Sequence, residues 1–477
     1  MEYHSSLSKV QAGIKEGALS LTDIVDKYLA RIEAHKHLNA FIEIYETEAR
    51  QKATALEEKI RAGEAGKLAG LVIGLKDLIC YQGHGVSAGS KMLENYTSVF
   101  SSTVVERLLA EDAIIIGRLN CDEFAMGGSN ENSYFGPVKN FADNSRVSGG
   151  SSGGSAVAVQ AGLCMATLGT DTGGSVRQPA SFCGVVGLKP TYGRVSRHGI
   201  IAYASSFDQV GPITTSVEDA ALILEVIAGR DEYDSTSSTL PVPAYSEHLL
   251  LDSKKRIAYL PETLESEGLD PEVRALTEKT IESLKAQGHS VEPISFPYLD
   301  YVVPTYYILT MAEASSNLAR YDGVHYGYRS ANAADLETTY KKSRSEGFGA
   351  EVKRRVMLGT FVLSAGHYDA FYGKAQRVRR VIREKTEEII KEHDFIILPT
   401  SPGPAFGLGE KTDDPVVMYL ADIFTVQASL AGIPAISLPL GNNTDALPLG
   451  IQLIGKRFGE KELLAFSKHL MDVTKNQ

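Results

Sequence analysis

Hydrophobic residues near the start of the chain follow the spacing of amphipathic helices. Over residues 21–33, apolar side chains recur every three or four positions, which predicts a helix with one buried face. Ser20 stands where this helix would begin, and Asp23 three residues later completes a spacing similar to a capping box. A second helix is predicted over residues 46–61.

Farther along the chain, short continuous apolar runs replace this spacing and indicate buried strands. The runs GLVIGL (70–75) and AIIIGR (113–118) enclose the helical stretch TVVERLLAED (103–112), which predicts the order strand, helix, strand. The same alternation resumes at about residue 255. Further predicted elements are strands within 256–262, 290–296, 393–400, 432–440 and 449–455, a helix at 271–288, a mainly helical segment over about 300–393 and a last helix at the carboxyl end.

This order of elements predicts an α/β protein built on a single large mixed β-sheet that is covered by helices on both faces. Residues 1–65 are expected to form N-terminal helices packed on the core, and residues 66–477 to form one large domain. The stretch from about 120 to 215 is rich in Gly, Ser and Thr and has only brief apolar segments, which indicates strands joined by structured turns. Functional residues often lie in such loops, so we expect the active site there.

Composition narrows the possible functions. The chain has 477 residues, of which 43% are hydrophobic and 22% charged, so it can bury a large core. With 59 acidic and 48 basic residues its net charge is -11, which would repel a phosphate backbone; contact with nucleic acid is therefore expected to be local or made by a partner. No export signal or long uncharged apolar run is found, which predicts a cytoplasmic protein without membrane contact. The four cysteines are far apart and form no C-x-x-C pair, so no metal site is expected.

The segment VSGGSSGGSA (147–156) concentrates glycine and serine and admits three interpretations. A flexible linker would have polar flanks, whereas this segment continues into the apolar AVAVQAG. A phosphate-binding P-loop needs a lysine, and the segment has none. Gly150, Ser152 and Gly154 match the G-x-S-x-G turn of serine hydrolases. That turn follows a buried strand, whereas polar residues come before this one, and no histidine lies in a motif that would indicate a catalytic partner. The hydrolase turn therefore stays an alternative, with Ser152 as its nucleophile.

A second small-residue cluster, LGTDTGGSVRQPASFCG (168–184), offers a better nucleophile in Ser175. Glycines next to an expected helix start permit a sharp turn and leave backbone N–H groups uncovered. The N–H groups of Thr172, Gly173, Gly174 and Ser175 itself could converge there on a developing oxyanion. Serine needs a proton acceptor within hydrogen-bond reach, and since no histidine is indicated, the base is expected to be another residue type.

Three strings in fixed order carry a resemblance to a known family. They are GLKDLI around residue 76, GGSSGGSA at 149–156 and GTDTGGSVRQPA at 169–180. Together they resemble the amidase signature family of serine hydrolases, and the resemblance covers nearly the whole chain. It implies the fold of that family and the hydrolysis of an amide.

The resemblance also implies a catalytic triad. Ser175 would be the nucleophile, Ser151 a bridging serine in a cis peptide after Gly150, and Lys76 the base. An exposed lysine has a pKa of about 10.4, so this role requires burial that disfavours the charged form. The apolar residues before Lys76 provide such surroundings.

Strings in the carboxyl-terminal half, such as LADIFTVQASLAGIPAISLP, resemble one branch of the family most closely. Its members supply ammonia in the bacterial amidotransferases that act on Glu-tRNA(Gln) and Asp-tRNA(Asn). Glutamine is then the implied substrate, and as a zwitterion it needs both a cation and an anion in its site. The resemblance implies Arg355 for the α-carboxylate, Asp422 for the α-ammonium and Tyr306 as a further contact, with the helical segment 300–393 contributing to recognition.

That branch implies partners as well. The chain would work in a heterotrimer with subunits B and C, the partner subunit would use ATP and Mg, and misacylated tRNA would be bound mainly through the partner. No cofactor is expected in this chain. Two alternatives remain: a stand-alone amidase that acts on simple amides, and a subunit with a scaffold role but no catalysis.

Overall fold

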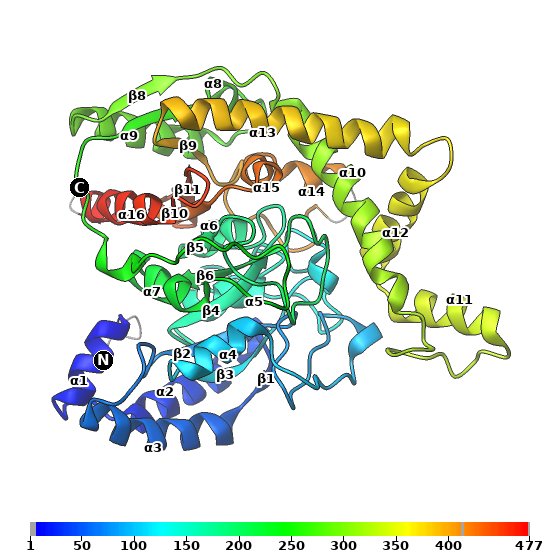
Figure 1. Cartoon of the computed structure of the whole chain (residues 1–477), viewed down its shortest axis with the longest axis horizontal. Coiled ribbons are helices and arrows are strands. Elements are labelled where there is room, and N and C mark those ends of the chain that lie inside the picture. Colours follow the sequence, from blue (N-terminus) through cyan, green and yellow to red (C-terminus); the bar gives the residue numbers. More distant parts are fainter. Residues whose placement is uncertain (1–5, 412–414, 476–477) are drawn as a thin grey trace.

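A single sheet of eleven strands forms the centre of the molecule (Figure 1). The computed structural model describes residues 6–411 and 415–475. The strands run in the order β1-β3-β2-β4-β6-β5-β10-β11-β9-β7-β8. Their bounds are β1 Phe41–Ile44, β2 Val72–Lys76, β3 Ile114–Leu119, β4 Ala166–Asp171, β5 Val186–Lys189, β6 Gln209–Thr214, β7 Arg256–Tyr259, β8 Ser290–Pro293, β9 Phe395–Pro399, β10 Ala435–Asn442 and β11 Pro448–Ile454.

The sheet is mixed, as the order of elements predicted. β2 pairs in parallel with both β3 and β4, whereas the central strands from β4 to β9 pair antiparallel. β7 returns to parallel pairing with β8 and β9. Helices lie on both sides of the sheet, so the predicted fold class is confirmed (Figure 1). All five residues of β2 are buried, because strands flank it on both edges and helices cover it.

The four helices predicted at 21–33, 46–61, 103–112 and 271–288 are present as α2, α3, α4 and α9, with ends within about two residues of the predicted ones. The Ser20 side chain accepts a hydrogen bond from the Asp23 N–H at 3.2 Å and caps α2. Helix α3 ends at Ala62, and the next residue, Gly63, has a φ of +74°, which suits glycine. The helices are α1 Leu7–Lys15, α2 Leu21–Ala34, α3 Glu46–Ala62, α4 Thr103–Ala110, α5 Gly153–Gln160, α6 Arg177–Cys183, α7 Val217–Ile227, α8 Pro261–Leu264, α9 Pro271–Ala286, α10 Leu299–Asn317, α11 Leu336–Gly347, α12 Ala350–Leu363, α13 Lys374–Glu392, α14 Pro415–Leu420, α15 Val426–Ala431 and α16 Glu460–Lys475. None of the helices in the described ranges is long and apolar enough to cross a membrane.

The first 65 residues differ in one respect from the prediction of helices alone. Residues 41–44 form β1, an edge strand that pairs antiparallel with β3. The strand has only four residues, three of them apolar and none fully buried, and a run this short does not distinguish a strand from a helix. The N-terminal segment therefore contributes directly to the main sheet.

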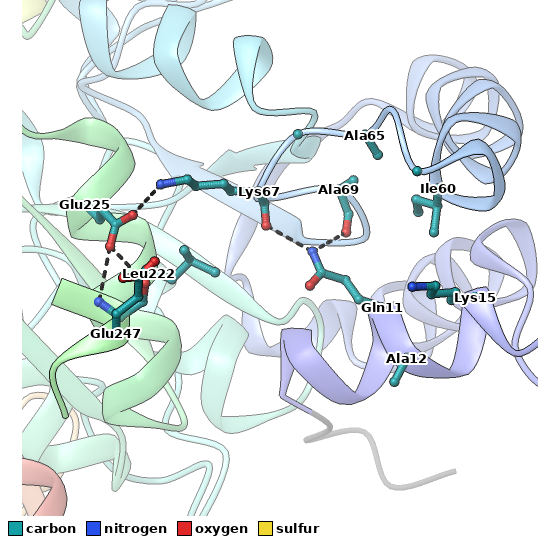
Figure 2. Close-up of a pocket in the computed structure, with 13 residues that line it drawn as sticks. Gln11, Ala12, Lys15, Ile60, Ala65, Lys67, Ala69, Leu222, Glu225 and Glu247 are labelled. Atoms are coloured by element: carbon teal, nitrogen blue, oxygen red, sulfur yellow. Dashed lines mark hydrogen bonds and ion pairs between the residues drawn. The ribbon is translucent and has the colours of Figure 1, made fainter. Parts of the chain in front are cut away.

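Helix α1 packs on the core through Leu7, Val10 and Ile14, and the side chain of Gln11 adds polar contacts. Gln11 Nε2 donates to the carbonyl oxygens of Lys67 and Ala69, both at 3.0 Å, and the Lys67 amine pairs with Glu225 of α7 at 2.6 Å (Figure 2). Beside these contacts lies a groove of about 500 Å³. None of the predicted site residues lines this groove, so it is separate from the site described next.

Candidate active site

Lys76 lies at the carboxyl end of β2 and has no exposed surface. Its Nζ donates hydrogen bonds to Ser151 Oγ at 2.8 Å, Ser152 Oγ at 2.9 Å and Thr170 Oγ1 at 2.9 Å. Thr170 belongs to β4, which runs parallel to β2, so the strand pairing itself brings this hydroxyl to the amine. The sequence motifs indicated Lys76 and Ser151, but they assigned Thr170 no role and Ser152 a different one.

Burial lowers the pKa of Lys76 to about 8, because the charged ammonium loses its hydration inside the protein. No ion pair joins Lys76 to a carboxylate of the described residues; its hydrogen-bond partners are three hydroxyl groups. At pH 7 about a tenth of the molecules would therefore carry a neutral amine at this position. A neutral amine has a free lone pair and can accept a proton.

Ser151 follows a cis peptide bond with Gly150, as the family resemblance implied. The Gly150 N–H donates to Gln178 Oε1 at 3.0 Å, and the Asp122 N–H donates to Ser151 O at 3.2 Å. A Cβ at position 150 would lie 2.1 Å from Asp122 Oδ2, so only glycine fits there. These contacts hold the backbone on both sides of this peptide bond, and the Ser151 hydroxyl contacts Lys76.

Ser175 lies between β4 and α6 and is 8% exposed. Its carbonyl oxygen accepts a hydrogen bond from the Ser152 N–H at 3.2 Å, which joins the two glycine-rich loops. Within the described part of the chain no hydrogen bond reaches Ser175 Oγ, from Ser151 or from Lys76. The structure therefore places Lys76 and Ser151 in contact and leaves the Ser175 hydroxyl free.

A buried ion pair holds the turn that carries Ser175. Asp171 accepts the Gly174 N–H at 2.9 Å and the Val176 N–H at 3.2 Å, while Arg177 Nε and Nη2 donate to the same carboxylate, each at 2.9 Å. Neither charged side chain has exposed surface, and Arg177 lowers the pKa of Asp171. One carboxylate thereby fixes the turn on both sides of the nucleophile candidate.

This ion pair corrects one prediction. The Gly174 N–H was expected to face an oxyanion, but it is engaged by Asp171 because the turn folds back over that carboxylate. The N–H groups of Thr172, Gly173 and Ser175 donate to no acceptor among residues 6–411 and 415–475, and these three remain available. A Cβ on Gly173 would lie 2.4 Å from Tyr306 Cζ, so Tyr306 closes the site beside this amide.

Arg355 lies on α12 and is buried among aromatic rings. Its Nη1 donates to the Tyr203 hydroxyl at 3.0 Å, and its Nε donates to Glu351 Oε1 at 2.8 Å. The guanidinium centre also lies 5.2 Å from the ring centroids of both Tyr307 and Tyr419. The rings attract the cation, and the Glu351 carboxylate forms a buried ion pair with it, so an anion could be bound only by the donors that Glu351 and Tyr203 leave open.

Tyr307 connects Arg355 with Asp422, although no sequence motif assigned it a role. Its ring faces the guanidinium and its hydroxyl donates to Asp422 Oδ2 at 2.8 Å. Burial raises the pKa of Asp422 to about 7, so the carboxylate gains from a cationic partner. The predicted cation and anion sites thus lie on either side of one tyrosine. Its only signal in the sequence was its place beside Tyr306 in the string YYILTMAEASS.

A cavity of about 170 Å³ opens on this group of residues. Its lining includes Ser129, Tyr307, Glu351, Arg355 and Tyr419. The nucleophile turn is tied to the same region, since Thr425 Oγ1 donates to Gly173 O at 2.5 Å and follows Asp422 by three residues. No group of three or more potential metal ligands occurs in the described ranges. The lining of this cavity includes Arg355 but not Asp422, Tyr306 or Ser175.

Comparisons with known proteins agree with this arrangement. The family model described as Amidase matches residues 23–464. The A subunit of the glutamyl-tRNA(Gln) amidotransferase of Chlorobium luteolum is 52% identical over 98% of this chain and 96% of its own length.

Two solved structures share the fold. The A subunit of the glutamyl-tRNA(Gln) amidotransferase from Thermotoga maritima is 39% identical, with a TM-score of 0.79 over 98% of this chain and 94% of that chain. A peptide amidase from Stenotrophomonas maltophilia is 30% identical, with a TM-score of 0.82 over 99% and 97% of the two chains. The similarity thus extends to proteins named for different amide substrates.

Proposed function

The chain belongs to the amidase family, and from this premise we propose that it hydrolyses the side-chain amide of glutamine with Ser175 as the nucleophile. The observation that carries the proposal is the fully buried Lys76 amine, which lies 2.8 Å from Ser151 Oγ. This amine supplies the base that a serine nucleophile needs. The hydrolase turn around Ser152 is not needed for this chemistry, because Ser152 helps to hold the amine.

In the proposed mechanism, Ser175 Oγ attacks the amide carbon while its proton passes through Ser151 to neutral Lys76. The N–H groups of Thr172 and Gly173 hold the oxyanion. The C–N bond then breaks, and ammonia leaves with the proton that returns from Lys76 through Ser151. Water next hydrolyses the glutamyl ester, which releases glutamate and restores Ser175. Substrate binding has to close the contact between Ser151 and Ser175, as is common for catalytic hydrogen bonds in free enzymes.

The substrate is proposed to bind through its charged ends. Arg355 would receive the α-carboxylate, since its Nη2 has no acceptor among the described residues. Asp422 would receive the α-ammonium, which favours the ionised form of a carboxyl whose pKa burial has raised. Tyr306, 3% exposed and packed against Gly173, would contact the bound substrate next to the reacting amide.

The wider role follows from the relatives at 50–52% identity, each named as the A subunit of a glutamyl-tRNA(Gln) amidotransferase. We propose that the released ammonia converts Glu-tRNA(Gln) to Gln-tRNA(Gln), or Asp-tRNA(Asn) to Asn-tRNA(Asn), in a heterotrimer with subunits B and C in the cytoplasm. The net charge of -11 favours a partner as the main tRNA-binding component. ATP and Mg would likewise be used by the partner.

A second candidate is a stand-alone amidase that acts on simple amides. The peptide amidase with 30% identity and a TM-score of 0.82 favours it, because that protein shares the fold. The two candidates use the same triad and differ in whether Arg355 and Asp422 bind the substrate.

Replacement of Ser175 by alanine should lower ammonia release from glutamine by at least about 1,000-fold, because no nucleophile remains. A coupled glutamate or ammonia assay measures the rate. Ser181→Ala, a change at another buried serine in the neighbouring α6, should keep activity within about threefold of the parent. Parental activity in Ser175→Ala would remove the nucleophile assignment.

The dependence of kcat/KM on pH should separate the titration of Lys76 from that of Asp422. With a simple neutral amide, kcat/KM should fall about tenfold per pH unit below pH 8, because the protonated Lys76, whose pKa is about 8, cannot accept a proton. With glutamine the fall should steepen below pH 7, where Asp422 becomes protonated and loses its attraction for the ammonium. In Asp422→Asn the steeper part should disappear. A flat profile between pH 6 and 9 would argue against Lys76 as the base.

Arg355→Met should raise the KM for glutamine by roughly 30- to 100-fold, since a charge-assisted contact to the carboxylate is lost. The KM for a simple amide without a carboxylate should change by less than about threefold. Arg329→Met, at an exposed arginine, serves as the matched control. An equal effect on both substrates would favour the stand-alone amidase.

The complex with subunits B and C should form amidated tRNA from misacylated tRNA, ATP and glutamine. With Ser175→Ala in this complex, glutamine should no longer support the reaction, whereas added ammonium salt should, because only the ammonia source is missing. Acid gel analysis or digestion of the labelled aminoacyl-tRNA measures the product. Undiminished use of glutamine by the variant complex would contradict the proposed role.

A further inference from the structure

We propose that Glu123 is a positioning residue for substrate recognition: its carboxylate caps the amino end of α12 and thereby fixes where Arg355 stands. Glu123 lies in a short 3-10 helix, Glu123–Ala125, that follows β3, far in sequence from α12. The inference rests on the proposed role of Arg355 as the carboxylate-binding residue.

The capping contact is direct and buried. Glu123 is 3% exposed, and its Oε2 and Oε1 accept the Gly349 N–H at 2.8 and 3.1 Å. Gly349 immediately precedes α12 and has no side chain to cap the helix. Ser90 Oγ donates to Glu123 Oε1 at 2.5 Å and holds the carboxylate in place. Burial raises the pKa of Glu123 to about 7, whereas the hydrogen bonds from Ser90 and Gly349 and the positive end of the helix dipole favour its ionised form.

Position 349 is shaped around this carboxylate. Its φ is -70° and its ψ is 172°, an extended conformation that any residue adopts, so the backbone does not require glycine. A Cβ there would nevertheless lie 2.3 Å from Glu123 Oε2. The requirement for glycine is therefore steric and comes from Glu123 alone.

Apart from the cap, the position of α12 is set mainly by its close packing against α10 (Figure 1). Its buried residues are Val352, Arg355, Gly359 and Val362. Gly359 approaches α10 so closely that a Cβ would lie 1.9 Å from Met311 O. Arg355 thus stands between two fixed points, the Glu123 cap at one end and the contact with α10 one turn farther on. Loss of the cap would free the first turn and shift the guanidinium relative to the reacting amide.

The first test compares two substrates in Glu123→Ala. The KM for glutamine should rise by about five- to tenfold, as expected for the loss of a helix cap, while kcat and KM for a simple amide without a carboxylate stay within about twofold. Glu123→Gln keeps an oxygen that can accept the Gly349 N–H, so its KM for glutamine should stay within about threefold of the parent. Equal losses on both substrates, or no loss with glutamine, would overturn the proposal.

The second test uses the steric relation between the two positions. Gly349→Ala alone should raise the KM for glutamine by a similar factor, because the new methyl group displaces the carboxylate. In Glu123→Ala/Gly349→Ala the methyl group meets no carboxylate, so the second change should add almost nothing. Effects that multiply in the double variant would contradict a shared contact.

Failure of this inference differs from failure of the proposed function. If Arg355→Met raises the glutamine KM and Glu123→Ala does not, only the positioning role is wrong. If Arg355→Met has no selective effect, the assumed carboxylate site is wrong and the positioning role is overturned with it.

Discussion

The chemistry proposed for this chain depends on one constraint, the burial of the Lys76 amine without a neutralising carboxylate. A pKa near 8 instead of 10.5 means that burial destabilises the charged form of the amine, relative to the neutral form, by about 3 kcal/mol. An ion pair would remove this cost but would also keep the amine protonated. Three hydroxyl groups satisfy the amine without adding charge, and one of them, Ser151, also offers a path for the proton. The sheet accommodates the cost because β2 is closed on both edges by neighbouring strands.

The buried pair of Asp171 and Arg177 differs from Lys76, because each of its two side chains keeps its charge. Asp171 and Arg177 form a bidentate pair without solvent contact, and removing one partner of such a pair usually costs several kcal/mol. Arg177 also donates to Thr425 O at 2.8 Å and to Gln452 Oε1 at 2.5 Å. The pair thereby joins the nucleophile turn to β11 and to the chain segment that follows Asp422. The backbone of the nucleophile turn is thus held in place, while no hydrogen bond within residues 6–411 and 415–475 holds the Ser175 hydroxyl.

Local sequence patterns predicted much of the fold but little of the site geometry. The cap of α2 and the strands β2 and β3 depend on neighbouring residues, so their signals lie within a few positions. Lys76 and Ser151 are 75 positions apart, and only the family resemblance paired them. The contacts of Thr170 with Lys76 and of Tyr307 with Asp422 arise from strand pairing and helix packing across 94 and 115 positions, which no local pattern records. The prediction for the Gly174 N–H was wrong because this group donates to the Asp171 side chain. The position of that side chain depends on the folded turn and cannot be predicted from the composition of the segment.

The residues proposed for catalysis and those proposed for substrate binding are held by different parts of the fold. This difference bears on how substrate preference can vary within the family. Lys76 and Ser175 are held by a strand end and a buried ion pair within the sheet. Arg355 and Tyr307 stand on α12 and α10, outside the sheet, and depend on helix packing (Figure 1). A shift or substitution in those helices would alter which amide fits without moving the amine or the hydroxyls. The chain shares its fold with proteins named as a glutamyl-tRNA(Gln) amidotransferase subunit and as a peptide amidase, which is consistent with such variation.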